Sequence, residues 1–505
     1  MSTESEVQEQ KTEAQYATQA SLISCVVTNN QGVELPPLNG DMILGFIHRE
    51  SLLSPFMSGI LAISDSADFL NGLDMDGNQS PIEGGEIVKI TVKTPVSKDE
   101  GGETYEYKIW KIGNRISINK KQAYALALVS EEALLNETTR IVGRIPSGGQ
   151  NKKEQPQKSI SGIVEDLIKT DIGINSSKPF YSEDTKFKQV IIGARRRPFD
   201  IISSLSDKAV STKGKTGSDN SSSSSESSET KETIKGTAGF FFWETIRGYH
   251  FFSVDALCDE PDGIFSAPDL QTEIHKGYQE KIANAEGVDT RSVISKITFT
   301  SEVDTLSALR KGKYSTNIIF FNLSTGQYEE YQYKITDSYK NMAHLGNQTK
   351  VSDLKVGEQQ LVETPSRLMT IILDHEKWFN DPGIADSEDP SNPENPAAYA
   401  DWHKHFAAQS VARKELLMNQ QCTVVIPGNN EICAGDKVEI KVQRKAPDKV
   451  KEEEPWDLES SGVYLVKDVE HSYNFADGTS GTVITTLQLF RDSYGVKDTD
   501  TKRGE

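Results

Sequence analysis

The short motifs that mark catalytic and cofactor sites are missing from this 505-residue sequence. It has no HExxH, Walker loop, GxSxG or dinucleotide-binding fingerprint. His403 and His405 stand two residues apart on a predicted helix, so their side chains diverge and cannot chelate one metal ion together. We therefore expect no enzymatic activity, no catalytic residue, no cofactor and no metal. The 75 acidic residues still leave room for a chance carboxylate pair of the glycosidase kind.

Cysteine and long apolar runs are scarce as well. Cys25, Cys258, Cys422 and Cys433 are dispersed without a CxxC pair. Cys422 and Cys433 could face each other across a hairpin, but reduced, buried thiols are the favoured state. No run of about 18 apolar residues is present to span a bilayer, and the polar N-terminus lacks the apolar core of a signal peptide. We expect no stable membrane insertion.

An excess of positive charge is also lacking, because 75 acidic residues outnumber the 55 lysine and arginine residues and give a net charge of -20. This argues against binding nucleic acid through a broad basic surface, since affinity for phosphates comes chiefly from lysine and arginine. It remains compatible with a channel whose wall repels DNA. A hydrophobic content of 36% over this length predicts three or four domains joined by polar connections.

What the sequence does contain is a repeat, whose two copies lie about 350 residues apart. Gly85 to Lys93 aligns with Gly435 to Gln443, as a glycine and an acid followed by a strand of alternating apolar residues. Two further strands match in the same order, although any two amphipathic strands after such a turn look somewhat alike. We interpret the match as two copies of one β module, with structural repeat positions Gly85, Glu86, Val88, Ile90, Val92, Leu126, Leu128, Gly435, Asp436, Val438, Ile440, Val442, Leu487 and Leu489.

Between the copies the apolar period changes to that of helices. Ser159 is expected to cap one helix, and Pro198 to start another. An acidic stretch near residues 271–284 also reads as helical. Arg195, Arg196 and Arg197 could bind phosphate, but a salt-bridging or inter-subunit role is favoured in so acidic a chain.

An aromatic hairpin spans Gly239 to Ser253 and must bury its rings. A base-stacking platform is conceivable, whereas the core or a subunit interface is favoured because no basic residues interleave. Phe241 and Trp243 join the three arginines as candidate inter-subunit contacts.

The predicted fold is α+β and β-rich, with two related tube-type antiparallel β-barrel domains and an intervening mixed α/β region. The predicted division is a disordered arm at 1–19, a first barrel at 20–146, a mixed α/β domain at 155–290 with a low-complexity loop at 211–237, a second β region with a long insertion (380–397) and a helix at 291–420, second barrel strands at 421–495 and a flexible tail at 496–505.

Several of these features together resemble a known family. They are the helix start at Arg197 to Ile202, the aromatic hairpin, the Gly312 to Ser315 segment and the strands at 461–466 and 483–490. In this combination the chain resembles the baseplate hub protein of contractile-tailed, T4-like bacteriophages, and it is related in the same way to the hub portion of type VI secretion spike proteins.

The resemblance implies a non-enzymatic structural protein of the virion tail baseplate, assembled in the host cytoplasm. It implies a homotrimer whose six barrels join a hexameric tail tube to a trimeric central spike, with other baseplate proteins around it and DNA passing through without specific binding during genome ejection. Two alternatives stay open: the hub of a phage-derived contractile injection system, and a β-domain protein that binds or acts on glycans.

Overall fold

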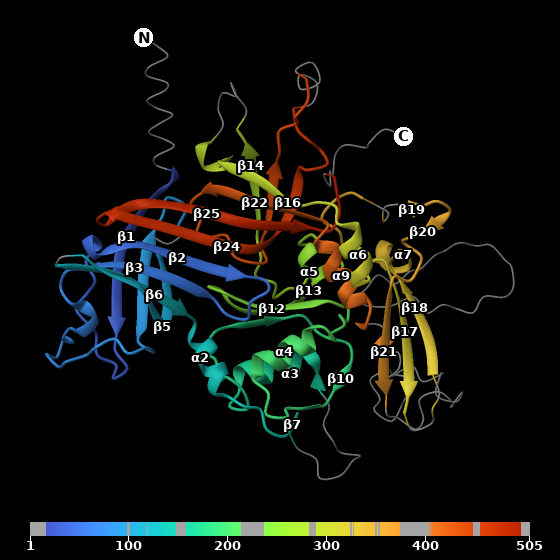
Figure 1. Cartoon of the computed structure of the whole chain (residues 1–505), viewed down its shortest axis with the longest axis horizontal. Helices are drawn as coiled ribbons and strands as arrows, with labels where there is room; N and C mark the ends of the chain where they lie inside the picture. The colour runs from blue at the N-terminus through green and yellow to red at the C-terminus, as the bar shows by residue number, and fades with distance from the viewer. Residues whose placement is uncertain are drawn as a thin grey trace.

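The computed structural model describes residues 17–97, 101–118, 120–147, 158–213, 237–281, 289–323, 326, 328–348, 351, 354–373, 403–404, 406–447 and 455–495. Strands dominate, and thirteen of them form one continuous sheet (Figure 1). The expectation of a β-rich fold is confirmed. The expected arm up to residue 16, residues 214–236 of the low-complexity loop, the 380–397 insertion and the 496–505 tail lie outside the described residues. None of the helices within the described ranges has both the length and the apolar character that crossing a membrane requires.

The first module is a six-stranded antiparallel sheet formed by residues 19–129. Its strand order is β2-β3-β6-β5-β4-β1. On β4, Val88, Ile90 and Val92 are buried and Lys89 and Lys93 are exposed, because successive side chains of a strand point to opposite faces. The strands are β1 (Gln19–Thr28), β2 (Ile43–Ser51), β3 (Ser58–Asp65), β4 (Ile87–Lys93), β5 (Glu103–Ile118) and β6 (Lys121–Val129).

The second module repeats this order with strands from two distant parts of the chain. Its order is β16-β22-β25-β24-β23-β14, so every strand has a counterpart in the first module. The one difference is that β14 runs parallel to β23, whereas β1 is antiparallel to β4. A short strand, β15, comes just before β16 and pairs with β14. The strands are β14 (Ile274–Glu280), β15 (Val293–Ile294), β16 (Lys296–Ser301), β22 (Gln420–Pro427), β23 (Lys437–Lys441), β24 (Gly462–Asp477) and β25 (Ser480–Arg491).

One local irregularity recurs at the same place in both modules. The β5–β6 register shifts between Ile109 and Lys111, and the β24–β25 register shifts between Val466 and Asp468. Ile109 pairs with Leu128 and Val466 with Leu489, which the sequence alignment also matches, so both β-bulges occupy one position of the repeat.

The glycine before each acidic repeat position also matches. Gly85 has a φ of +94° and Gly435 a φ of +90°, a conformation that glycine adopts without steric cost. The carboxylates of Glu86 and Asp436 follow and are buried. The match of three strands found in the sequence therefore extends to six strands, a bulge and a turn.

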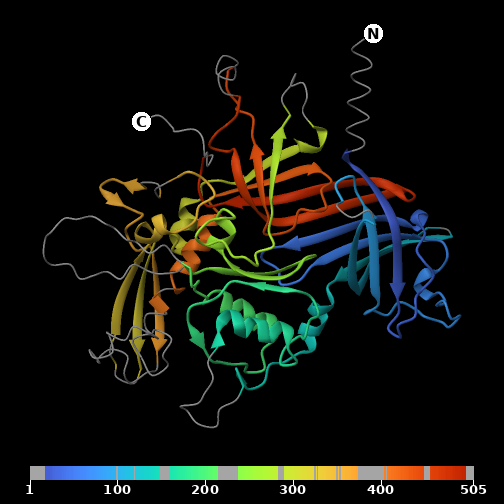
Figure 2. The ribbon, with the colours of Figure 1, turned by 180° about the vertical axis from the view of Figure 1, so that it is seen from behind.

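The two modules share the hairpin formed by β24 and β25. Asp468 to Asn474 of β24 pairs with Ser51 to Gly45 of β2, and the beginning of β25 pairs with the beginning of β1. With the pairs inside the first module, these contacts close a circuit of eight strands, in which the red hairpin lies beside the blue strands (Figures 1 and 2). Tyr473, Phe475 and Val483 enter the core of the first module. The C-terminal hairpin is thus a structural part of the N-terminal module.

The second module also takes in residues that the sequence division placed elsewhere. β14 lies in the segment assigned to the mixed α/β domain, yet it pairs with β23. The expectation of a helix near residues 271–284 is wrong over Ile274–Glu280, because pairing with β23 buries Tyr278 in the second core and overrides the local helical pattern. Residues 302–419 separate β16 from β22.

A mixed α/β layer packs against the modules around the aromatic hairpin β12–β13 (Figure 2). Ser159 caps α3 by accepting a hydrogen bond from the Gly162 amide at 3.3 Å, and Pro198 opens α4, both as predicted. The elements are α2 (Glu131–Thr138), β7 (Arg144–Ile145), β8 (Lys158–Ser159), α3 (Ile160–Lys169), β9 (Phe180–Ser182), β10 (Lys188–Gln189), β11 (Ile191–Ile192), α4 (Pro198–Ser206), β12 (Phe240–Thr245), β13 (Gly248–Ser253) and α5 (Val254–Cys258).

The segment between β16 and β22 forms a small sheet of order β18-β17-β21, and α9 leads back to the second module. Its elements are α6 (Thr305–Lys311), β17 (Ser315–Asn322), β18 (Tyr328–Lys334), α7 (Ile335–Ser338), β19 (Lys355–Val356), β20 (Gln359–Gln360), β21 (Arg367–Leu373) and α9 (Gln409–Leu417). Short 3-10 turns η1 (Gly40–Met42), η2 (Phe69–Asn71), η4 (Thr290–Ser292) and η5 (Tyr339–Asn341) complete the described elements.

Candidate functional site at the junction of the modules

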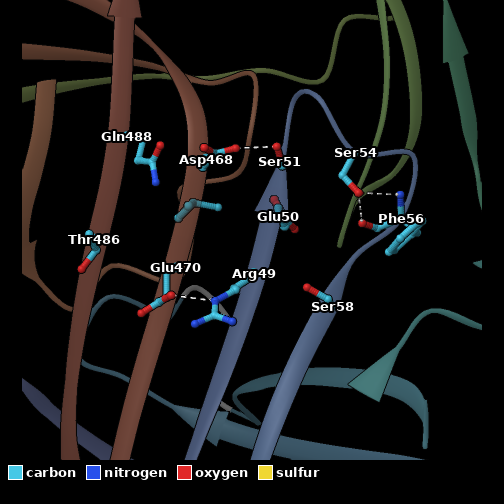
Figure 3. A pocket seen from close by; sticks show the side chains of 11 residues that line it. Arg49, Glu50, Ser51, Ser54, Phe56, Ser58, Asp468, Glu470, Thr486 and Gln488 are labelled. Carbon is cyan, nitrogen blue, oxygen red and sulfur yellow. Dashed lines mark hydrogen bonds and ion pairs between the residues drawn. The ribbon is translucent and has the colours of Figure 1, made fainter. Parts of the chain in front are cut away.

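The seam between β2 and β24 carries a shallow cavity of about 260 Å³ on its outer face (Figure 3). Arg49 lies directly opposite Glu470, and its Nε donates a hydrogen bond of 2.7 Å to the Glu470 carboxylate. Ser51 donates to the carboxylate of Asp468 in the same way. The Arg49–Glu470 pair is partly exposed, and exposed pairs contribute only about 0–1 kcal/mol, so these contacts specify register more than they stabilise the fold.

Buried histidines form the inner face of the same seam. His48 and His471 stand directly opposite each other, with nearly parallel rings whose centroids are 5.7 Å apart. His48 Nε2 lies 3.2 Å from the Glu50 carboxylate, and its Nδ1 contacts the Tyr107 hydroxyl. His471 contacts the Thr485 hydroxyl at 3.0 Å and the Ile432 carbonyl at 3.1 Å. Each histidine therefore finds its hydrogen-bond partners within its own module, away from water, and the two rings stack across the seam.

Glu50 joins three separate parts of the chain at this point. Its carboxylate accepts hydrogen bonds from the Ile246 amide at 2.7 Å and from the Ala434 amide at 3.0 Å. Ile246 lies in the turn of the aromatic hairpin, and Ala434 belongs to the second module. A single buried carboxylate thus connects both modules to the mixed α/β layer.

Glu244 on β12 makes a second connection of this kind. It accepts a hydrogen bond of 3.0 Å from the Met57 amide of the first module and pairs with Lys178, which also pairs with Glu132. Burial raises the pKa of the Glu244 carboxyl, and the Lys178 ammonium offsets only part of that effect.

The buried acid of the second repeat copy holds the opposite side of the junction. Asp436 accepts two hydrogen bonds from Arg247, at 2.8 and 3.0 Å, and lies 3.1 Å from His275 Nε2 on β14. Burial would raise the pKa of Asp436, but the bonds from His275 and Arg247 outweigh it and hold the pKa below its usual value. In the first copy Glu86 instead accepts from the amides of Glu83 and Gly84, so the repeat acid has acquired a connecting role only in the second module.

Arg413 of α9 is the centre of another buried network. Its guanidinium donates to Asp255 of α5 at 3.1 Å, to Asp492 after β25 at 2.9 Å and to the Ala343 carbonyl. All three charged side chains are fully buried. Burial would raise the pKa of Asp492, but His344 and Arg413 together hold it well below its usual range. These contacts join α9 and the loop at Ala343 to α5 and to the end of β25.

The structural repeat positions predicted from the sequence are all buried except Gly85, which is half-buried. The apolar ones among them line the cores of the two modules. Arg195 and Arg196 are exposed, while Arg197 is half-buried and pairs with Glu137 at 2.9 Å, as the salt-bridging interpretation expects.

Phe241 and Trp243 require a correction as candidate inter-subunit contacts. Both rings lie in the core of this chain, and Trp243 Nε1 donates a hydrogen bond of 2.9 Å to the Ala434 carbonyl. Both rings lie on the face of the hairpin that packs against the second module, where the glycine-acid turn meets Trp243, while α4 packs on the opposite face.

Sequence reasoning missed His48, Glu50, His471, Asp255 and Asp492. One signal was available for two of them, since His48 and Glu50 alternate with the buried Phe46 on β2 and so fall on its inward face. Within the described ranges, no three His, Cys, Asp or Glu side chains are arranged to hold a metal ion. All four cysteines are free and buried. The polar groups at the junction are engaged in joining segments of the chain.

The stability of the junction is expected to depend on pH through His471. Burial, together with the neighbouring His48, lowers the pKa of His471 to about 3 from 6.5. Between these values the unfolded chain binds a proton that the folded chain does not, so this contribution is complete above about pH 6.5 and is lost as the pH falls towards 3. We expect the free energy of unfolding to fall by up to ~1.4 kcal/mol per pH unit from this site.

Urea unfolding at several pH values across that window checks the expectation. The slope of the free energy against pH should be smaller in H471Q than in the unmodified protein. H403Q, which changes a histidine outside the junction, should keep the original slope. Equal slopes in H471Q and the unmodified protein would contradict the assignment.

No protein-family model matches the sequence, and no curated protein matches it significantly. Solved structures do match. A tail protein from Neisseria meningitidis MC58 is 12% identical, with 93% of this chain and 96% of that chain covered and a TM-score of 0.43. The 43 kDa tail protein of prophage MuSo2 from Shewanella oneidensis is 8% identical, with 93% and 98% covered and a TM-score of 0.45.

The Escherichia coli c3393 protein, a component of the type VI secretion system, is 10% identical, with 96% of this chain and 80% of that chain covered and a TM-score of 0.39. The chain is therefore similar over most of its length to tail proteins and to a secretion-system component. At these identities no residue role is transferred from them.

Proposed function

We propose that this protein is the structural baseplate hub of a contractile phage tail. Three copies associate as a homotrimer, and their six modules, each a tube-type barrel, form a ring. Such a ring presents pseudo-sixfold symmetry to a hexameric tail tube and threefold symmetry to a trimeric central spike. The protein works by joining these partners and has no catalytic role.

The observation that carries the proposal is the repeated sheet order of the two modules. A shared topology with a matching bulge and turn means that one chain supplies two near-equivalent units. Two equivalent units in each of three chains give the six positions that a hexameric partner requires. The motifs that resemble the hub family support the same role.

The net charge of -20 agrees with a channel through which DNA leaves without binding. Phosphates are repelled by a wall poor in lysine and arginine, so the ring acts as a conduit and not as a DNA-binding surface. A strongly basic lumen in the assembled ring would contradict this part of the proposal.

Mass in solution combined with negative-stain electron microscopy tests the function. The expected result is a trimer with six similar lobes around a central hole. The spike protein is added to a second sample, because assembly of a hub can require its partner. A chain that stays monomeric in both samples would overturn the proposal and favour a monomeric glycan-binding protein, which a glycan-binding screen would then examine.

Removing the serine-rich segment is expected to leave assembly intact. The Ser211 amide donates a hydrogen bond of 2.9 Å to the Thr237 carbonyl, and Val210 forms an antiparallel β-bridge with Ala238. The two ends of the segment therefore already lie side by side. Replacement of residues 214–236 by a short Gly-Ser turn should therefore change the thermal midpoint by no more than a few degrees and leave the number of chains in the assembly unchanged. Dissociation of the shortened protein into monomers would show that the segment takes part in assembly.

A further inference from the structure

The far half of β5 has an edge without a strand partner in the described part of the chain. Glu103 to Lys108 pairs with β4, and Ile109 exchanges backbone hydrogen bonds with Gly85 and Glu86, but from Trp110 to Ile118 β5 pairs only with β6. This half exposes three large apolar side chains, Trp110 at 55%, Ile112 at 36% and Ile116 at 58%. An open strand edge with exposed apolar side chains is a template for pairing with another chain.

β16 has an open edge as well, within the same described ranges. It pairs with β22 on one side. The short strand β15, which precedes it in the chain, pairs with β14. Ile297 and Phe299 are only partly buried against the second core. Val303, just past the end of the strand, is 79% exposed.

The repeat shows what these two edges correspond to. β5 is the counterpart of β24, and β16 is the counterpart of β2. Within the chain, the far half of β24 pairs antiparallel with β2 and completes the first module. The equivalent pair, the far half of β5 with β16, is not made within the chain, since β5 already belongs to the first module and β16 to the second.

We propose that the free edge of β5 pairs antiparallel with the free edge of β16 in a second copy of this chain. Each inter-module contact in the ring is then the same kind of contact, made once inside the chain by β24 and β2 and once between chains by β5 and β16. The inference rests on the proposed trimer and names its interface. This contact joins two different surfaces of the chain, so each copy binds the next one head to tail. In the proposed trimer each copy is rotated by a third of a turn relative to the last, and the ring closes after three copies.

The cover that apolar side chains receive at the inner seam favours this occupant. Inside the chain, the counterpart seam is crossed by the Arg49–Glu470 ion pair and buries Tyr473 and Phe475. The exposed Ile112 and Ile116 gain the same kind of cover from the neighbouring second module.

The register of the inner pair sets the register of the outer one. Arg49 stands opposite Glu470. Their counterparts, found through the pairs with β22 and β6, are Ser301 and Gly113. Opposed residues in antiparallel strands have Cβ atoms about 4.5–5.5 Å apart, close enough for a disulfide after small movements. A Cβ at Gly113 meets nothing nearer than the Lys111 side chain at 4.0 Å, so a cysteine fits there.

Oxidative cross-linking of the full chain carrying G113C and S301C tests the pairing. The natural cysteines are all buried, which keeps cross-linking through them low. The expected result is covalent dimers and trimers on a non-reducing gel, roughly tenfold more than in the pair I192C and S301C, because the paired strands hold the thiols at high effective concentration. Ile192 is 69% exposed on β11 and serves as the matched exposed control. R49C with E470C should form a disulfide within one chain and leave the mass unchanged.

Amide hydrogen exchange of the unmodified protein tests the same interface without any substitution. Amides from Lys111 to Ser117 should be protected in the trimer and exchange faster after dilution to monomers. A trimer that shows neither cross-linking above the control nor this protection would overturn the β5–β16 interface and leave the trimeric hub in place. A protein that is monomeric with and without the spike, and does not cross-link, would overturn both.

Discussion

Arg413→Met is expected to cost about 3–5 kcal/mol of unfolding free energy, the usual loss when one partner of a buried ion pair is removed. The substitution keeps most of the side-chain volume but leaves the carboxylates of Asp255 and Asp492 buried without their shared cation. It also removes the donor to the Ala343 carbonyl. Urea unfolding at neutral pH measures the loss directly.

Lys414→Met is the matched control, since Lys414 is the next cation on α9 and pairs with the exposed Asp207. It should change the free energy of unfolding by less than about 1 kcal/mol. Adding Asp492→Asn to Arg413→Met should recover part of the loss, because one uncompensated charge is then gone. A loss below about 1 kcal/mol for Arg413→Met alone would show that this network does not hold α9 to α5 and to the end of β25.

Trp243→Ala is expected to lower the free energy of unfolding by about 3–5 kcal/mol, the range for large-to-small changes of buried aromatic side chains. The indole is fully buried, and its ring fills the space where a Cβ on Gly435 would lie. Its loss opens a cavity between the aromatic hairpin and the second module. The lost bond from Nε1 leaves the Ala434 carbonyl without that donor.

Trp243→Phe should cost less than Trp243→Ala, because a smaller cavity remains although the hydrogen bond is lost. Trp110→Ala removes an indole that is 55% exposed, and in monomeric protein it should change stability by less than about 1 kcal/mol. Chemical unfolding followed by far-ultraviolet circular dichroism compares the three variants. Similar losses for Trp243→Ala and Trp110→Ala would contradict the burial of Trp243.

The candidate site was less accessible to sequence reasoning than the fold. The repeat positions were visible because a buried strand face leaves a period of two, as in Val438, Ile440 and Val442. His471 and Asp492 leave no such mark, since a polar residue on a strand or just after it is usually exposed. Their burial depends on partners that are hundreds of residues away or on another element, such as His48 and Arg413.

Locally encoded features were therefore within reach of the sequence by itself. Alternating strands, the glycine-acid turns, the Ser159 cap and the Pro198 helix start depend on neighbours a few residues apart. Tertiary structure alone decided that β24 and β25 complete the first module, and that β14 to β16 belong to the second. Strand pairing is non-local, since an open edge accepts any strand that presents matching hydrogen bonds and an apolar face, and only the assembled cores determine which strand that is.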